Sequence, residues 1–135
     1  MSMPVVLSCT HRKSGLAVVV CGLHLSVPVG PQGQFDGQRQ SLELEGCLRA
    51  VGEQVGPEGS GSRQAGPGVI VAGDFNSLPA SALCESLAAR GLASAYARVL
   101  GAEPPCTTVN SDQGFVGTVD YVWFGGPGLR ARRVL

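Results

Sequence analysis

The sequence predicts an α/β sandwich, and three observations lead to that prediction. Two apolar segments, 16–25 and 69–72, have the nearly continuous hydrophobicity of strands that are buried on both faces. Between them, residues 38–55 repeat apolar side chains at helical spacing. Because strands that alternate with helices form a sheet with helices packed on it, we expect a β-sheet with flanking helices.

The N-terminal part is expected to form two strands around the polar turn 11–15, with Gly15 available for a positive φ. The β-branched triplet 18–20 favours a strand for the second segment. In the helix that follows, apolar residues at three- and four-residue steps form one face, and Asp36 is the expected N-cap. The residues of that face are Leu44, Leu48, Val51 and Val55.

Further along the chain, residues 56–68 are rich in Gly, Pro and Ser and predict a flexible loop within the domain. A second helix is expected over Pro79–Arg90, with the proline in its first turn and Gly91 just past its end. Residues 91–115 are expected to be irregular. Residues 116–124 then predict a final strand, and 129–135 the start of another.

The chain has 135 residues, which fits one domain or part of a larger one, and 44% of them are hydrophobic, enough for a core. Ten basic and ten acidic residues give a formal net charge of zero. A protein that binds nucleic acid without sequence preference needs a basic excess, because neutralised phosphates supply most of its affinity. Any nucleic-acid role must therefore depend on a local site.

The chain contains five cysteines without CxxC or zinc-ligand spacing, which indicates reduced thiols in a cytoplasmic or nuclear protein. They are Cys9, Cys21, Cys47, Cys84 and Cys106. The N-terminus lacks the basic and apolar regions of a signal peptide, and no apolar run approaches the roughly 20 residues that span a bilayer. We therefore expect an intracellular protein with no membrane partner.

The segment GDFN places two polar side chains just after the strand 69–72. In extended backbone, Asp74 and Asn76 point the same way, at the carboxyl end of a strand, where open α/β sheets bind ligands. Asp74 can bind a hard cation directly or through water, or activate a water nucleophile, and Asn76 can hold that water or a phosphate oxygen. The structural alternative is that Asp74 or Asn76 caps the following turn and helix. Phe75 is expected to point into the core.

Two further polar residues follow the same pattern of strand ends. His24 ends the other central strand, where it can contact a phosphoryl oxygen or protonate a leaving group, or simply lie hydrogen-bonded at the rim. Asp120 interrupts an apolar strand, and a buried carboxylate needs a partner. That partner is either neighbouring backbone or a histidine that the carboxylate orients. His11 lies in the polar turn and is not expected to be the histidine that Asp120 orients.

In combination, His24-Leu25, GDFNSLP and CTTVNSDQGFVGTVDYVWF resemble the endonuclease/exonuclease/phosphatase family of metal-dependent phosphoesterases. The similarity is greatest to its deadenylase-like branch, which includes the carbon catabolite repression deadenylases, nocturnin and the Angel proteins. It extends from Val5 to Leu135. It implies a hydrolase, a nuclease or exonuclease, with a four-layered α/β sandwich as its fold and Mg²⁺ as its cofactor, or Mn²⁺ in its place. The substrates it implies are phosphate esters of RNA 3′ ends, poly(A), cyclic phosphates or nucleotides.

Carried over residue by residue, the resemblance implies four site residues. His24 contacts the scissile phosphate, and Asp74 activates the attacking water and touches the metal shell. Asn76 holds phosphate and water. Asp120 hydrogen-bonds to the family's catalytic histidine. The metal stabilises negative charge on the phosphoryl oxygens during attack by water.

The sequence departs from the family pattern in three places. Gly22 and Leu23 stand where the branch has Asn and Thr before its histidine. The family's main metal-binding glutamate and its final Ser-Asp-His motif have no counterpart among residues 1–135. We therefore expect a partial domain, an incomplete half of the family fold, which needs the rest of the domain or another chain to cover its sheet. The alternative is a catalytically inactive pseudo-nuclease that serves as an interaction module, and a weaker one is an unrelated α/β binding domain.

Overall fold

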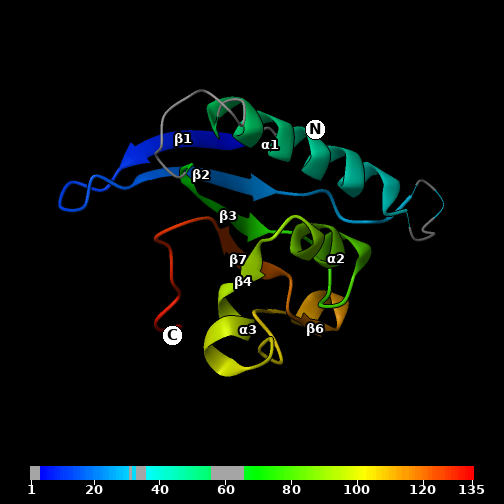
Figure 1. Ribbon diagram of the computed structural model, residues 1–135. Coiled ribbons are helices and arrows are strands. Elements are labelled where there is room, and N and C mark those ends of the chain that lie inside the picture. Colours follow the sequence, from blue (N-terminus) through cyan, green and yellow to red (C-terminus); the bar gives the residue numbers. More distant parts are fainter. Residues whose placement is uncertain (1–3, 31, 33–35, 56–65) are drawn as a thin grey trace.

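The computed structural model describes residues 4–30, 32, 36–55 and 66–135 (Figure 1). Most of the predicted loop 56–68 lies outside these residues. Its last part, Gly66 and Pro67, leads directly into a strand that begins at Gly68.

Five strands form one sheet in the order β1-β2-β3-β7-β4. They are β1 (Val5–Thr10), β2 (Ala17–His24), β3 (Gly68–Asp74), β7 (Asp120–Gly125) and β4 (Ala93–Ser94). β2 and β3 are parallel, and every other neighbouring pair is antiparallel. The sheet is therefore mixed. This confirms the predicted α/β class, a mixed sheet with flanking helices.

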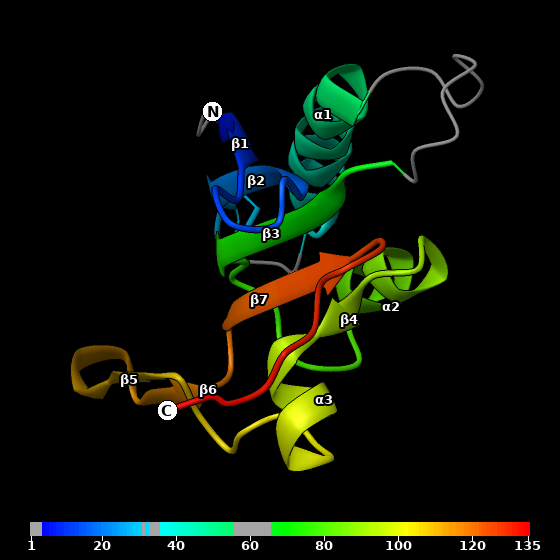
Figure 2. The ribbon, with the colours of Figure 1, turned by 60° about the vertical axis from the view of Figure 1, so that its left-hand side comes forward.

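The helices and the remaining short elements lie around this sheet (Figure 2). The helices are α1 (Gln38–Val55), α2 (Ala82–Ala89) and α3 (Ala95–Leu100). A two-stranded sheet pairs β5 (Thr108–Asn110) with β6 (Phe115–Gly117), and the 3-10 helix η1 (Ser111–Gln113) joins them. None of the described helices is both long and apolar enough to cross a bilayer.

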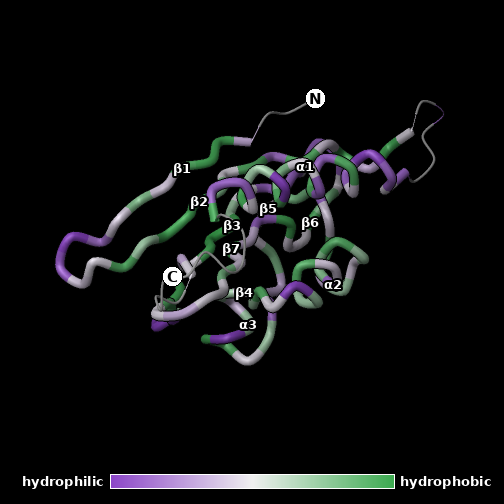
Figure 3. The backbone as a smooth tube through the Cα atoms, turned by 45° about the horizontal axis from the view of Figure 1, so that its top comes forward, coloured by the Kyte–Doolittle hydropathy of each residue, from purple (hydrophilic) through white to green (hydrophobic). Residues whose placement is uncertain are grey.

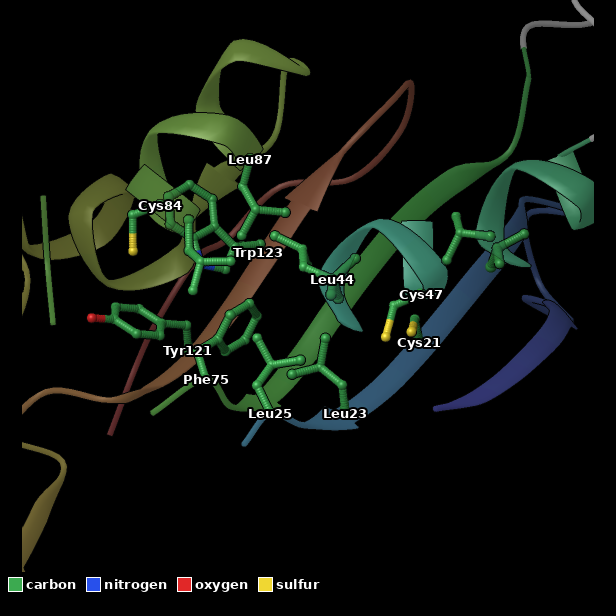
Figure 4. Close-up of a cluster of buried hydrophobic side chains, with 14 residues drawn as sticks. Cys21, Leu23, Leu25, Leu44, Cys47, Phe75, Cys84, Leu87, Tyr121 and Trp123 are labelled. Carbon is green, nitrogen blue, oxygen red and sulfur yellow. The ribbon is translucent and has the colours of Figure 1, made fainter. Parts of the chain in front are cut away.

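One face of the sheet packs against α1 and α2 and forms the core (Figure 4). Alternate residues of β2, β3 and β7 contribute to it, as the two-residue period of a strand requires. The buried set is Val19, Cys21, Leu23, Leu25, Leu44, Cys47, Val51, Val71, Phe75, Leu83, Cys84, Leu87, Tyr121 and Trp123. Phe75 is fully buried and packs edge-on against Tyr121 with ring centroids 5.4 Å apart. The predicted core position of Phe75 is confirmed.

The first predicted hairpin and helix are confirmed. Gly15 adopts φ +70° in the hydrophilic turn between β1 and β2, whereas β2 and β3 are mostly hydrophobic (Figure 3). Asp36 accepts a hydrogen bond from the backbone N–H of Gln38, the first residue of α1, at 3.0 Å. The carbonyl of Gly37 accepts the first bond of the helix, from Ser41, so the N-cap is Gly37 and not Asp36 as predicted. Leu44 and Val51 are buried, and Leu48 packs against the same core.

The predicted start of the second helix is wrong. Residues 79 and 80 form a turn, and α2 begins at Ala82. The reason is that Ser81 accepts a hydrogen bond from the backbone N–H of Cys84 and so caps the helix itself. The predicted end is close, because Gly91 has φ +80° just after the last turn.

Three predictions for the C-terminal third are also wrong. Residues 91–115 are not irregular, since they contain β4, α3, β5 and η1. The predicted final strand 116–124 is split between β6 and β7, because residues 118 and 119 belong to no strand and connect the two sheets. Residues 129–135 form no strand. These elements are too short to produce a recognisable hydrophobic period.

The second face of the sheet is only partly covered by described residues. Val5 and Leu7 of β1 and Val122 of β7 are 61%, 55% and 41% exposed there. The β2 residues on the same face are half-buried or exposed, so β2 is not buried on both faces as predicted. Next to Val122, the segment 129–134 borders a pocket on this face, and Leu129 approaches Gly68. The expected open apolar face is thus present in part.

Gly73 marks a close approach between β3 and β2. Its φ is +143°, and a Cβ at this position would lie 1.8 Å from the carbonyl oxygen of Leu23. No side chain fits without separating the two strands just before they end.

We predict that Gly73→Ala lowers the free energy of unfolding by at least about 3 kcal/mol, because strain and overlap act together. Urea unfolding of the full chain measures this. Gly52→Ala is the matched control: Gly52 is exposed on α1 with open space around it, so the same change should stabilise by about 0.5–1 kcal/mol. Equal effects of the two substitutions would contradict the close approach at Gly73.

Candidate active site

Three of the predicted site residues occupy one row across three adjacent strands. In the sheet register, His24 of β2 pairs with Asp74 of β3, and Asp74 pairs with Asp120 of β7. Paired residues of neighbouring strands project to the same face, so the three side chains stand next to one another. The ends of β2 and β3 and the start of β7 therefore converge on one corner of the sheet.

Asp74 is at the centre of this row and is half-buried. Its Oδ1 accepts the backbone N–H of Asn76 at 2.7 Å, which stabilises the turn after β3. Its Oδ2 lies 3.7 Å from Nε2 of His24. One carboxylate oxygen thus stabilises the turn, as expected if Asp74 caps it, while the other oxygen faces His24.

Asn76 departs from the geometry that the sequence predicted. Its φ is +46°, so the backbone is not extended, and strand alternation does not explain where its side chain points. The carboxamide Nδ2 donates to the carbonyl oxygen of Leu25 at 2.7 Å and joins the ends of β3 and β2. Asn76 nevertheless lines the same pocket as Asp74. The turn, and not strand alternation, places both side chains at this pocket.

His24 and Asp120 differ in how firmly they are held. The His24 side chain is 69% exposed at the rim, with Asp74 beside it. The Asp120 carboxylate is half-buried, and its Oδ2 accepts hydrogen bonds from the hydroxyls of Thr107 at 2.7 Å and Thr108 at 2.6 Å. Thr107 also accepts the backbone N–H of Asp120. Asp120 is therefore held in a fixed orientation by side chains that the sequence reading missed.

The sequence reading also missed Gln40 and Glu43, which α1 buries beneath the same corner. Gln40 is 1% exposed and donates to the backbone carbonyls of Phe75 and Asn76. Glu43 is 6% exposed and accepts both the N–H and the hydroxyl of Ser26. The available signal was a polar side chain on the apolar stripe of the helix, since Gln40 lies four residues before Leu44.

Tyr121, on the core face of β7, also binds the backbone of this corner. Its hydroxyl is within 2.9 Å of the carbonyl oxygens of both Ser77 and Thr118. Burial raises the pKa of Tyr121, with further contributions from Cys84 and nearby carboxylates. The hydroxyl therefore keeps its proton, and its single hydrogen can be donated to either of the two carbonyls.

A pocket of about 740 Å³ opens beside Asp74 and Asn76. Its walls combine apolar side chains with uncharged amides, and Asp74 is the charged residue among the described lining residues. The apolar walls are Val27, Pro28, Val29, Leu78, Phe115 and Val119, and the amides are Asn76, Asn110 and Gln113. A concave, mainly apolar site with a few fixed polar groups is typical of small-molecule binding.

Oxygen ligands are those that Mg²⁺ prefers, and the carboxylate of Asp74 is of that kind. However, the described residues include no group of three or more His, Cys, Asp or Glu that could hold a metal ion.

The sequence model of the endonuclease/exonuclease/phosphatase family matches residues 26–135, which include β3 and β7 of the row and the whole corner after β2, but not His24. The chain belongs to this family. The family predicted from His24, GDFN and Asp120 is thereby confirmed, and an unrelated α/β domain is excluded. No curated protein sequence matches the chain.

Solved structures share this fold. The catalytic domain of human nocturnin, solved with a bound sulfate anion, superposes with a TM-score of 0.58 at 22% identity, over 92% of this chain and 41% of that one. ANGEL2, described as a 2′,3′-cyclic phosphatase, gives 0.60 at 18%, over 94% and 50%. The mannosyl-6-phosphatase Bt3783 of Bacteroides thetaiotaomicron gives 0.55 at 15%, over 94% and 43%. The chain thus spans half or less of each of these relatives.

Glu43 should make stability depend on pH. Burial raises its pKa, but hydrogen bonds from Ser26 and Arg39 outweigh this effect and hold the pKa below the ordinary 4.5. The folded state therefore binds this proton less tightly than the unfolded state. The stabilisation is complete above about pH 4.5 and is lost as the pH falls through the folded-state pKa.

We predict that Glu43→Gln lowers the free energy of unfolding by about 1–3 kcal/mol at pH 7 and reduces its loss below pH 4.5. Urea midpoints at neutral and acidic pH measure both effects. Glu45→Gln, on the exposed side of the same helix where Glu45 pairs with Arg90, is the matched control and should change stability by less than about 1 kcal/mol. If Glu43→Gln lost as much stability below pH 4.5 as the wild type, this role would be contradicted.

Proposed function

We propose that this chain supplies His24, Asp74, Asn76 and Asp120 to the active site of a metal-dependent phosphoesterase, a nuclease or phosphatase of the deadenylase-like branch. The observation that supports this most is the register of the sheet, which pairs His24 with Asp74 and Asp74 with Asp120. A histidine, a carboxylate and a carboxamide at one strand-end corner can position water and a phosphoryl group together.

Each residue has a role that its surroundings allow. Asp74 keeps Oδ2 free of the turn and can accept a proton from an attacking water. His24, exposed beside it, can donate to a phosphoryl oxygen. Asn76 has one amide hydrogen and its carbonyl oxygen left after bonding to Leu25, and these can hold water or phosphate. Asp120, with Oδ1 unused by the threonines, orients a histidine of the complete site.

The metal ion in this proposal is inferred from the family. Asp74 would bind Mg²⁺ or Mn²⁺, directly or through water, and the ion would supply stabilisation of negative charge on the phosphate. Further ligands would come from a complete domain or from another chain that covers the open face of the sheet. The five free cysteines are consistent with an intracellular location, cytoplasmic or nuclear.

For the substrate, we propose a phosphate ester of RNA or of a nucleotide. The pocket beside Asp74 has apolar walls, the ring of Phe115 and the amides of Asn110 and Gln113, which suit a base better than a second phosphate. ANGEL2 acts on 2′,3′-cyclic phosphates according to its description, which fits the same class.

The pocket yields a prediction about base binding. In a complete enzyme, Phe115→Ala should raise KM for a nucleotide substrate by roughly five- to a hundredfold, because stacking contributes about 1–3 kcal/mol per base. Steady-state kinetics measure this. Val116→Ala is the control, since the exposed Val116 does not line the pocket. An equal effect of both changes would contradict a base in this pocket.

A second candidate function is supported by the missing metal-ligand group in the described residues: a catalytically inactive pseudo-nuclease that acts as an interaction module. Translation of the genomic sequence on both sides separates the two. An upstream strand that ends in glutamate and a downstream Ser-Asp-His would support the enzyme. Stop codons or unrelated sequence on both sides would favour the module.

For the 135-residue chain alone, we predict no hydrolysis of a 3′-labelled oligoadenylate in the presence of Mg²⁺, because the metal-binding glutamate and the final histidine that the family resemblance implies have no counterpart among residues 1–135. Gel analysis of the labelled strand tests this. Turnover that Asp74→Ala abolishes would contradict the expectation that the site must be completed from elsewhere.

A further inference from the structure

The side chain of Gln40 is buried at the point where the ends of β2 and β3 approach each other. Its Nε2 lies 2.8 Å from the carbonyl oxygen of Ser26, 3.1 Å from that of Phe75 and 3.0 Å from that of Asn76. Its Oε1 accepts the hydroxyl of Ser77 at 3.1 Å. One amide of α1 therefore contacts the segments after both strands.

These contacts involve the backbone that orients the site. The carbonyls of Phe75 and Asn76 flank the residue with φ +46°, and the two N–H hydrogens of Gln40, shared among three carbonyls, hold both peptide planes of the left-handed turn. This turn directs Asn76 to Leu25 and lets Asp74 accept the backbone N–H of Asn76. A change at Gln40 would reach both side chains through the backbone.

Glu43 also binds the segment that follows β2. Ser26 lies two residues after His24, and its N–H and hydroxyl bind Glu43 at 2.8 and 2.7 Å while its carbonyl accepts from Gln40. Both polar groups of the Ser26 backbone are therefore bound to adjacent turns of α1. The spacing between the two loops depends on the helix as well as on the sheet.

We propose that Gln40 is a positioning residue for the phosphoester site: its carboxamide clamps the Asp74–Asn76 turn to the end of β2 and so sets the separation of His24 from Asp74. The inference rests on the proposed function of that corner. Gln40 lies beneath the turn and acts through the backbone that it binds, so it does not touch the substrate.

The alternative is that Gln40 only stabilises the fold. A stabilising residue affects the whole sheet equally, whereas a clamp acts on the two loops that it joins. Amide hydrogen exchange separates the two, because it reports local opening at individual backbone positions.

The test is Gln40→Met, which keeps the side-chain length and removes both polar groups. In the 135-residue chain we expect exchange at the amides of Ser26 and Asn76 to rise at least about tenfold, with amides in the middle of β2 and β3 unchanged. The matched control is Gln38→Met, the same substitution on the exposed first residue of α1, which should change none of them. Unchanged exchange at Ser26 and Asn76 overturns the clamp.

A second test of the positioning role is the steady-state kinetics of the whole natural protein with a nucleotide substrate. Gln40→Met should lower kcat at least about tenfold with KM nearly constant, because the reacting groups are displaced while the pocket is kept. Leu48→Ala, which perturbs the packing of the same helix away from the corner, should retain kcat. If the two variants lose kcat equally, the positioning role is overturned.

Ser77→Ala covers the case in which Gln40→Met does not fold. It removes one hydrogen bond to Oε1 and leaves the contacts of Nε2, so a smaller rise of exchange at Asn76 is expected. No rise at Asn76 overturns the clamp. Absence of hydrolysis in every form of the wild-type protein would instead overturn the proposed function, since exchange does not depend on turnover.

Discussion

The parallel pairing of β2 with β3 is the constraint from which the rest of the site follows. Parallel neighbours cannot be joined by a tight turn, so the chain must leave the end of β2, cross over and return to the start of β3. The crossover contains α1, which begins at Gln38, and Gln40 in its first turn contacts Ser26, two residues beyond the end of β2. Gln40 and Glu43 therefore lie under the strand-end corner because of topology, and both strands end at the same edge. This pairing is close enough at Gly73 to exclude any side chain.

Much of the arrangement could be predicted from the sequence where the pattern was long. The apolar run that forms β2 and the 18 residues of α1 are unambiguous. The row of His24, Asp74 and Asp120 followed from polar residues at strand ends. Asn76 was misplaced because a left-handed turn overrides strand alternation.

The remaining parts could not be predicted because their determinants are distant in sequence. Gln40 is linked to Phe75 and Asn76 across 35 and 36 positions, and Asp120 to two threonines 12 and 13 positions away. Such partners become visible only when the chain has folded. The split of the last predicted strand has the same origin, because Val119 and Asp120 are bound to Thr107.

The two edges of the sheet have unequal consequences for assembly. β4 contributes two residues at one edge, too few to template another strand. At the other edge, β1 offers six residues of backbone with exposed valine and leucine side chains and no strand beyond it in the sheet order. Strand addition between chains, including aggregation during expression, would therefore begin at β1, which pairs directly with β2 but carries none of the candidate site residues. A substitution on β1 is therefore the place to improve solubility while leaving the candidate site residues unchanged.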